Sequence, residues 1–127
     1  MDLGQRTRAL KDVLDARPGA TTEALSARGG KTPLVLIYKV MGKTFAILGA
    51  RADEHVILKC DPHLIEILKE TYAGVGHRSH LDRRHWISVS LEADVPMDEV
   101  ERLAAGSYDL VCAGLTKKQR AELAALA

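Results

Sequence analysis

The amino-acid sequence predicts an α+β domain, in which helices pack on one face of a twisted antiparallel β-sheet. Two β-rich runs, residues 34–40 and 43–48, are joined by Met41-Gly42, which is the spacing of a hairpin with a two-residue turn. A third β-rich run, residues 55–60, follows after a short connection. Strands that follow one another through such short turns pair in antiparallel order, and the amphipathic segments around them supply the helical layer.

The first element is expected to be a helix that ends at a proline–glycine break. Residues 21–32 are polar and small and end in a double glycine, so we expect a loop there with one helical turn at most. The segment Arg17-Pro18-Gly19-Ala20 stops the preceding pattern. That pattern consists of apolar residues at helical spacing: Leu3, Leu10, Val13 and Leu14.

The hairpin predicts which side chains share a face. With a two-residue turn, Val40 lies opposite Lys43 and Tyr38 lies opposite Phe45. Strand alternation then assigns two faces. The expected core side carries Leu36, Tyr38, Phe45 and Ile47, and the other side carries Lys39, Thr44 and Ala46.

Directly after the third strand, Asp61-Pro62 combines an N-cap with a proline at the first helical position, which predicts a helix start. Gly74 and Gly76 end that helix. Its expected buried stripe is Leu64, Ile65, Leu68 and Tyr72. A fourth strand, residues 86–91, places Trp86 on a polar face with Ser88 and Ser90, opposite Ile87, Val89 and Leu91.

Two helices are predicted to close the chain. Val95-Pro96 opens the first of them, with Asp98 and Glu99 in the first turn, where the helix dipole favours acids. Thr116 and Gln119 form a capping box for the last helix. The residues expected to face inward from the first are Val100, Leu103, Ala104, Tyr108, Leu110 and Val111.

Length and composition limit the possible functions. The 127 residues are 46% hydrophobic with a formal net charge of +1, so we expect one domain over residues 1–127 and no global attraction to nucleic acid. No run approaches the roughly 18 apolar residues of a membrane span, so no membrane partner is expected. Cys60 and Cys112 stand in separate apolar runs, which predicts buried thiols in a reducing cytoplasm.

The segment GHRSHLDRRHW, residues 76–86, carries three of the five histidines and the only tryptophan. A metal site at His77, His80 and His85 is disfavoured, because the spacing is irregular and the interleaved arginines repel a cation. The chain also lacks a nucleophile elbow, a P-loop, a dinucleotide fingerprint and the H-E-x-x-H motif. We therefore predict no enzyme, no catalytic residue, no metal ligand and no cofactor.

Anion binding is the favoured chemistry of this segment. Its three arginines, less Asp82, give a local charge of +2, and guanidinium forks suit phosphate oxygens. Trp86 beside them can stack on a base. An alternative stays open, in which Trp86 covers the rim of the sheet and the arginines pair with Glu66, Glu70 or Asp82.

The chain resembles the MmcQ/YjbR family through six segments in the same order: PGATTEA, YKVMGKTFAIL, LKCDP, HLDRRHW, SYDLV and LTKKQR. The resemblance runs from about Pro18 to Arg120, and LKCDP, RRHW and SYDLV are its most specific parts. It implies a fold similar to the CyaY (frataxin-like) arrangement in a small bacterial cytosolic protein. Members of the family are often described as DNA-binding because two hairpins resemble a pair of wings, which is an argument from shape alone.

The resemblance also implies where a DNA contact would lie. The basic-aromatic segment of the family falls on His80 and on the stretch from Arg83 to Trp86, and its SYDLV motif on Ser107, Tyr108 and Asp109. The residues predicted to contact nucleic acid are Lys39, Lys43, Lys59, Arg83, Arg84, His85 and Trp86. Because the net charge is nearly neutral and the segment from Thr21 to Thr32 is less aromatic than in many members, we expect weak, salt-dependent contact with DNA. The alternative is a protein-interaction or small-ligand-binding module without nucleic-acid binding.

Overall fold

The computed structural model describes residues 3–26, 33–50 and 53–126, and within them the predicted α+β fold with an antiparallel sheet is confirmed. Six strands lie in the order β1-β2-β3-β4-β6-β5. The strands are Ala20–Ser26 (β1), Pro33–Val40 (β2), Lys43–Gly49 (β3), His55–Lys59 (β4), Val75–Gly76 (β5) and Trp86–Ser90 (β6). The helices are Gln5–Asp15 (α1), Pro62–Thr71 (α2), Met97–Ala113 (α3) and Lys117–Ala124 (α4).

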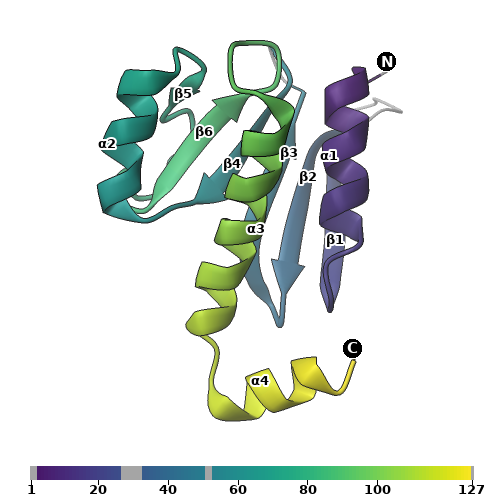
Figure 1. Ribbon diagram of the computed structural model, residues 1–127. Helices are drawn as coiled ribbons and strands as arrows, with labels where there is room; N and C mark the ends of the chain where they lie inside the picture. Colours follow the sequence, from purple (N-terminus) through teal and green to yellow (C-terminus); the bar gives the residue numbers. More distant parts are fainter. Residues whose placement is uncertain (1–2, 27–32, 51–52, 127) are drawn as a thin grey trace.

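Helices α1 and α3 lie side by side across one face of the sheet (Figure 1). α3 contacts β2, β3 and β4, and α1 contacts β1 and α3. α2 lies at the opposite edge of the sheet from α1, against β5. α2 therefore lies beside the loop that precedes β6.

Within the described ranges, no helix combines the length and the apolar character that crossing a membrane requires.

Both predicted helix caps are confirmed. The Asp61 carboxylate accepts a hydrogen bond from the His63 N–H at 2.8 Å, and Pro62 occupies the first turn of α2. At α4, the Thr116 hydroxyl accepts from the Gln119 N–H at 3.1 Å, and the Gln119 side chain accepts from the Thr116 N–H at 3.0 Å. These bonds satisfy N–H groups that a helix start leaves without partners, so each helix begins where its sequence signal stands.

Two core positions on the helices were predicted wrongly. Leu64 of α2 and Leu110 of α3 keep 39% and 38% of their surface exposed. Both line a cavity of about 330 Å³ between α2 and α3, because the two helices diverge there instead of packing together. Of the two cysteines, Cys60 is buried as predicted, whereas Cys112 is only half-buried.

The predicted loop at residues 21–32 is wrong over its first half, which forms the edge strand β1. Its backbone pairs with β2 from Ala20 opposite Val40 to Ser26 opposite Pro33. The side chains of residues 21–25 are exposed, so the apolar alternation that announces a half-buried strand is missing. The remainder, residues 27–32 with Gly29-Gly30, lies outside the described residues. The two-residue strand β5 was also not predicted.

A β-bulge corrects the predicted faces of the hairpin. Val40 lies opposite Lys43 as expected, but the register then shifts, and Tyr38 lies opposite Ala46 instead of Phe45. The extra residue turns both Phe45 and Ala46 toward the helices, where both are fully buried. Ile47 consequently lies on the other face, opposite Ile37 and Ile57.

A serine of α3 completes the sheet beside this bulge. The regular pairing of β3 with β4 ends at Ala46 opposite Leu58. The Ser107 hydroxyl, itself fully buried, accepts a hydrogen bond from the Lys59 N–H at 2.8 Å and donates one to the Phe45 carbonyl at 2.5 Å. One side chain thus satisfies two backbone groups that no strand partner reaches.

The neighbouring Tyr108 fixes α3 against the start of the sheet. Its ring packs edge-on against Phe45 with centroids 5.2 Å apart, and Arg17 lies over the ring at 5.7 Å. Its hydroxyl donates to the Pro18 carbonyl at 2.5 Å. Ser107 and Tyr108, the first two residues of the SYDLV motif, therefore hold the fold together.

Candidate anion-binding site

The basic segment before β6 folds into a hydrogen-bonded turn, residues 82–85, which we call the basic turn. The Asp82 carboxylate accepts from the Arg84 N–H at 2.9 Å, and the Asp82 carbonyl accepts from the His85 N–H at 3.1 Å. The His85 carbonyl in turn accepts from the Cys60 N–H at 2.7 Å, which ties the turn to the end of β4. The backbone that carries both arginines is therefore held at both of its ends.

Asp82 keeps its charge in this turn. Its second carboxylate oxygen lies 2.6 Å from Nδ1 of His85. The hydrogen bond from the Arg84 N–H, followed by the one from His85, lowers the pKa of the Asp82 carboxyl below its ordinary value. A charged acceptor at neutral pH stabilises the turn.

The guanidinium groups of Arg83 and Arg84 remain available for a ligand. Among the ion pairs between described residues, none includes either arginine, so the predicted alternative of pairing with Glu66, Glu70 or Asp82 is not observed. Arg78 differs, because its guanidinium is paired with Asp53. The local positive charge of the segment therefore resides on the basic turn.

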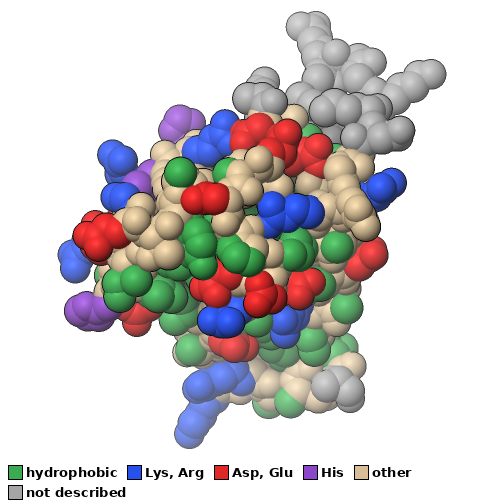
Figure 2. Space-filling model, turned by 45° about the horizontal axis from the view of Figure 1, so that its top comes forward, with side chains coloured by type: hydrophobic (Ala, Val, Ile, Leu, Met, Phe, Trp, Pro, Cys, Tyr) green, Lys and Arg blue, Asp and Glu red, His purple; other side chains and the backbone are tan. Residues whose placement is uncertain are grey.

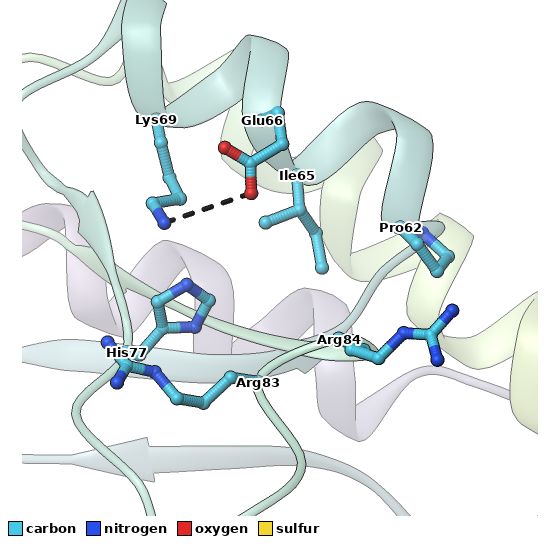
Figure 3. A pocket seen from close by; sticks show the side chains of 7 residues that line it. All are labelled: Pro62, Ile65, Glu66, Lys69, His77, Arg83 and Arg84. Atoms are coloured by element: carbon cyan, nitrogen blue, oxygen red, sulfur yellow. Dashed lines mark ion pairs between the residues drawn. The ribbon is translucent and has the colours of Figure 1, made fainter.

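A cavity of about 340 Å³ separates the basic turn from α2. Figure 3 shows that the side chains of Lys69, His77 and Arg83 gather at one end of it, while Arg84 extends in the opposite direction, toward Pro62. Lys69 lies 3.9 Å from Glu66, which also faces the cavity. Four ionisable side chains and one histidine thus surround a space large enough for a small ligand.

The imidazole of His77 is oriented by the backbone of β6. Its Nδ1 lies 3.1 Å from the Trp86 carbonyl oxygen. Because a carbonyl oxygen only accepts, Nδ1 carries the proton and donates this bond. The other ring nitrogen, Nε2, is left for a contact elsewhere.

Lys59 and Trp86 lie directly opposite each other in neighbouring strands, next to the basic turn. The predicted face of Trp86 is confirmed, because Ile87 and Val89 are buried on the helix side and Trp86 alternates with them. Trp86 is half-buried, so part of its ring is open to solvent. A base or another planar group can reach this ring.

The two lysines of the hairpin, Lys39 and Lys43, contact groups away from the basic turn. Lys39 lies 3.6 Å from Glu23 across β1 and β2. Lys43 donates to the Gly114 carbonyl at 3.1 Å, at the end of α3. Of the seven residues predicted to contact nucleic acid, five therefore adjoin one another at the basic turn: Lys59, Arg83, Arg84, His85 and Trp86.

No group of three or more His, Cys, Asp or Glu side chains within the described ranges is arranged to hold a metal ion. His77 contacts a backbone carbonyl, and His85 contacts Asp82. Each of these two imidazole rings therefore makes a hydrogen bond to another group of the protein itself.

Lys69 and Glu66 were not predicted as members of the site. A signal for them does exist in the sequence, because positions 62, 65, 66 and 69 recur at the spacing of one helical face. That spacing gives no indication of what the face would lie against. Only the folded arrangement, in which α2 and the basic turn lie on opposite sides of the cavity, brings this face to the site.

The chain is similar in sequence and in fold to several known proteins. A family model described as YjbR matches residues 16–110. The uncharacterized protein YjbR of Escherichia coli (strain K12) is 31% identical over 65 residues, which are 51% of this chain and 55% of that protein. The uncharacterized protein YbdF of Escherichia coli O157:H7 is 27% identical over 85 residues, 66% of this chain and 70% of that protein. The chain thus matches about half the length of the first of these relatives.

Two solved structures share the fold. A crystal structure of Deinococcus radiodurans protein DR2400, a DUF419 domain, has a TM-score of 0.76 at 27% identity and covers 96% of this chain and 92% of its own. A protein from Pseudomonas syringae has a TM-score of 0.63 at 19% identity, with 85% and 98% covered. The second likeness concerns the fold alone.

Proposed function

The chain belongs to the YjbR family, and from this premise we propose that it is a DNA-binding protein that contacts DNA through the basic turn and the adjoining Lys59 and Trp86. The observation that carries the proposal is the pair of arginines, Arg83 and Arg84, which stand on a hydrogen-bonded turn without a carboxylate partner among the described residues. A guanidinium presents two parallel N–H donors that fit the oxygens of a phosphate.

The fixed backbone of the turn supports this role. Since the turn is already ordered by Asp82 and tied to Cys60, fewer conformations are lost on binding. Trp86 adds a partly exposed aromatic ring beside the arginines, on which a base can stack. Lys59, opposite Trp86, adds a third cation at the same end of the sheet.

The charge distribution predicts weak binding. On the face shown in Figure 2, lysine and arginine side chains are interspersed with acidic ones and form no continuous positive stripe. The net charge of the whole chain is +1. Few phosphates are therefore contacted, and the dissociation constant is expected to be micromolar or weaker and to rise with salt.

The proposal is a binding role without catalysis. It places the protein in the cytoplasm, where the free thiols of Cys60 and Cys112 would stay reduced.

A fluorescence anisotropy titration of a labelled duplex at low salt tests the proposal. The double variant Arg83→Ala/Arg84→Ala should bind at least about tenfold more weakly. The slope of log K against log salt should fall by about 1.8, because two phosphate contacts are lost. Lys117→Ala/Lys118→Ala, on exposed positions of α4, removes the same charge away from the turn and should change binding little.

Absence of salt-dependent binding by the native chain refutes the proposal, and so does an equal loss in the α4 variant. The rival function, a small-ligand or protein-interaction module without nucleic-acid binding, is favoured by one observation, the cavity behind the basic turn.

A further inference from the structure

The charges around the cavity between α2 and the basic turn sum to +2. Lys69, Arg83 and Arg84 contribute three positive charges, and Glu66 contributes one negative charge. The Glu66 side chain is 74% exposed and lies 3.9 Å from the Lys69 ammonium, so this ion pair is loose and screened by solvent. The cavity therefore favours an anion of two charges over an anion of one.

The two kinds of phosphate in a nucleic acid differ in this respect. A phosphate with a single ester bond carries a charge of about −1.5 to −2 at neutral pH. A phosphodiester inside a strand carries only one negative charge. The charge of the cavity matches the monoester.

The shape of the cavity leads to the same ligand. α2 closes one side and the basic turn the other, so a group enters between them (Figure 3). An interior phosphodiester continues into sugars on both sides and has no free end to insert. The three free oxygens of a terminal phosphate would face Lys69, His77 and Arg83, which the cavity brings together at one end, and its single ester bond would point outward.

The wall of the cavity can hold the carbon part of such a ligand. Pro62 and the buried Ile65 of α2 supply apolar surface beside the charged end. Arg84, which extends toward Pro62, lies at the opposite end from Lys69. A ligand with its phosphate at one end and a sugar against this wall would contact both ends of the cavity.

We propose that this cavity binds a phosphomonoester, either at the end of a nucleic-acid strand or on a free nucleotide. The inference rests on the proposed function, because Arg83 and Arg84 belong to both. It deepens that function by naming the terminal phosphate, and not the interior backbone, as the group that the cavity selects.

Calorimetric titration with inorganic phosphate, adenosine 5′-monophosphate and adenosine tests the inference. The nucleotide should bind, inorganic phosphate should bind more weakly, and adenosine should not bind. Trp86, the only tryptophan of the chain, offers an independent signal, since its carbonyl holds the His77 ring at the cavity. Its fluorescence should change with the nucleotide and not with adenosine.

The variant Lys69→Gln/Arg83→Gln removes both cations at the phosphate end of the cavity and should weaken nucleotide binding at least about tenfold. Lys117→Gln/Lys118→Gln on α4 is the matched control and should bind as the native chain does. Melting temperatures of both variants within a few degrees of the native value, roughly 4 °C per kcal/mol for a chain of this size, show that the fold is kept. Should Lys69→Gln/Arg83→Gln melt lower than this, Arg83→Lys, which keeps the charge and loses the fork, replaces it and should bind the nucleotide more weakly.

Duplexes with a 5′-phosphate or a 5′-hydroxyl separate the possible outcomes. Tighter binding of the phosphorylated duplex, with competition by the nucleotide, supports the inference for strand ends. Nucleotide binding without binding of either duplex supports it for free nucleotides and refutes the proposed DNA function. Equal binding of both duplexes without nucleotide binding overturns the inference and leaves the DNA function standing. If none of the ligands binds, both proposals fail.

Discussion

Replacing Ser107 by alanine should destabilise the fold far more than removal of one oxygen atom suggests. The Ser107 hydroxyl accepts from the Lys59 N–H and donates to the Phe45 carbonyl, and it is fully buried. In the variant, both backbone groups lose their partner at a position that water does not reach. The bulge in the hairpin keeps strand pairing from supplying a substitute.

Leaving a buried donor or acceptor unsatisfied costs about 1–3 kcal/mol for each group. Two such groups cost about 2–6 kcal/mol, and alanine recovers about 0.5 kcal/mol through its higher helix propensity within α3. The free energy of unfolding should therefore fall by about 2–4 kcal/mol when the structure relaxes partly around the site. For a chain of this length, that corresponds to a melting temperature lower by roughly 8–16 °C.

The assay is urea denaturation followed by circular dichroism, with Ser88→Ala as the matched control. Ser88 on β6 is equally buried, at 1% exposure, and lies within regular strand pairing, opposite Ile57 of β4 and Gly76 of β5. Its replacement should change the free energy of unfolding by less than about 1 kcal/mol. If the two variants lose the same stability, the bridging role of Ser107 is wrong.

Two further predictions concern ionisable groups. The Asp82 pKa is lowered by the Arg84 N–H and by His85, so the stabilisation of the basic turn should be complete above the ordinary aspartate pKa of about 3.9 and should disappear as the pH falls through the lowered value. The Arg84 amide resonance should follow this titration, and a midpoint at or above about pH 3.9 would contradict it. Burial, with a smaller contribution from Asp61, raises the pKa of the Cys60 thiol to about 11, so alkylation mapped by mass spectrometry should modify the half-buried Cys112 first. Equal rates at the two cysteines would show that Cys60 is not protected.

The parts of the fold that the sequence predicts correctly depend on local signals. Met41-Gly42 makes the hairpin turn, and Asp61-Pro62 starts α2, because a turn and a cap are determined by a few neighbouring residues. The strand β1 has no comparable signal. The side chains that the structure describes in it are exposed, so no apolar alternation marks it, and its pairing depends on the backbone of β2, the next strand along the chain. The bulge beside Phe45 likewise depends on contacts with α3.

The candidate site likewise has one part that local sequence predicts and one part that only the tertiary structure reveals. The basic turn was predicted because Arg83, Arg84 and Trp86 are adjacent in sequence. The cavity was not predicted, because Lys69 of α2 faces the basic turn only in the folded chain. Sequence adjacency identifies the charges that are present, whereas tertiary packing decides which of them a ligand meets.

The bond from His77 to Trp86 has a consequence for how the molecule behaves at high concentration. β5 stops after Gly76, so beyond this point β6 becomes the outer strand, which would present a bare carbonyl at Trp86. An unpaired strand edge is a template on which another chain can add a strand. The His77 ring donates a hydrogen bond to this carbonyl, in place of the N–H that a further strand residue would supply. The Trp86 carbonyl is therefore not free to accept a hydrogen bond from an added strand, and this end of β6 should not start edge-to-edge association.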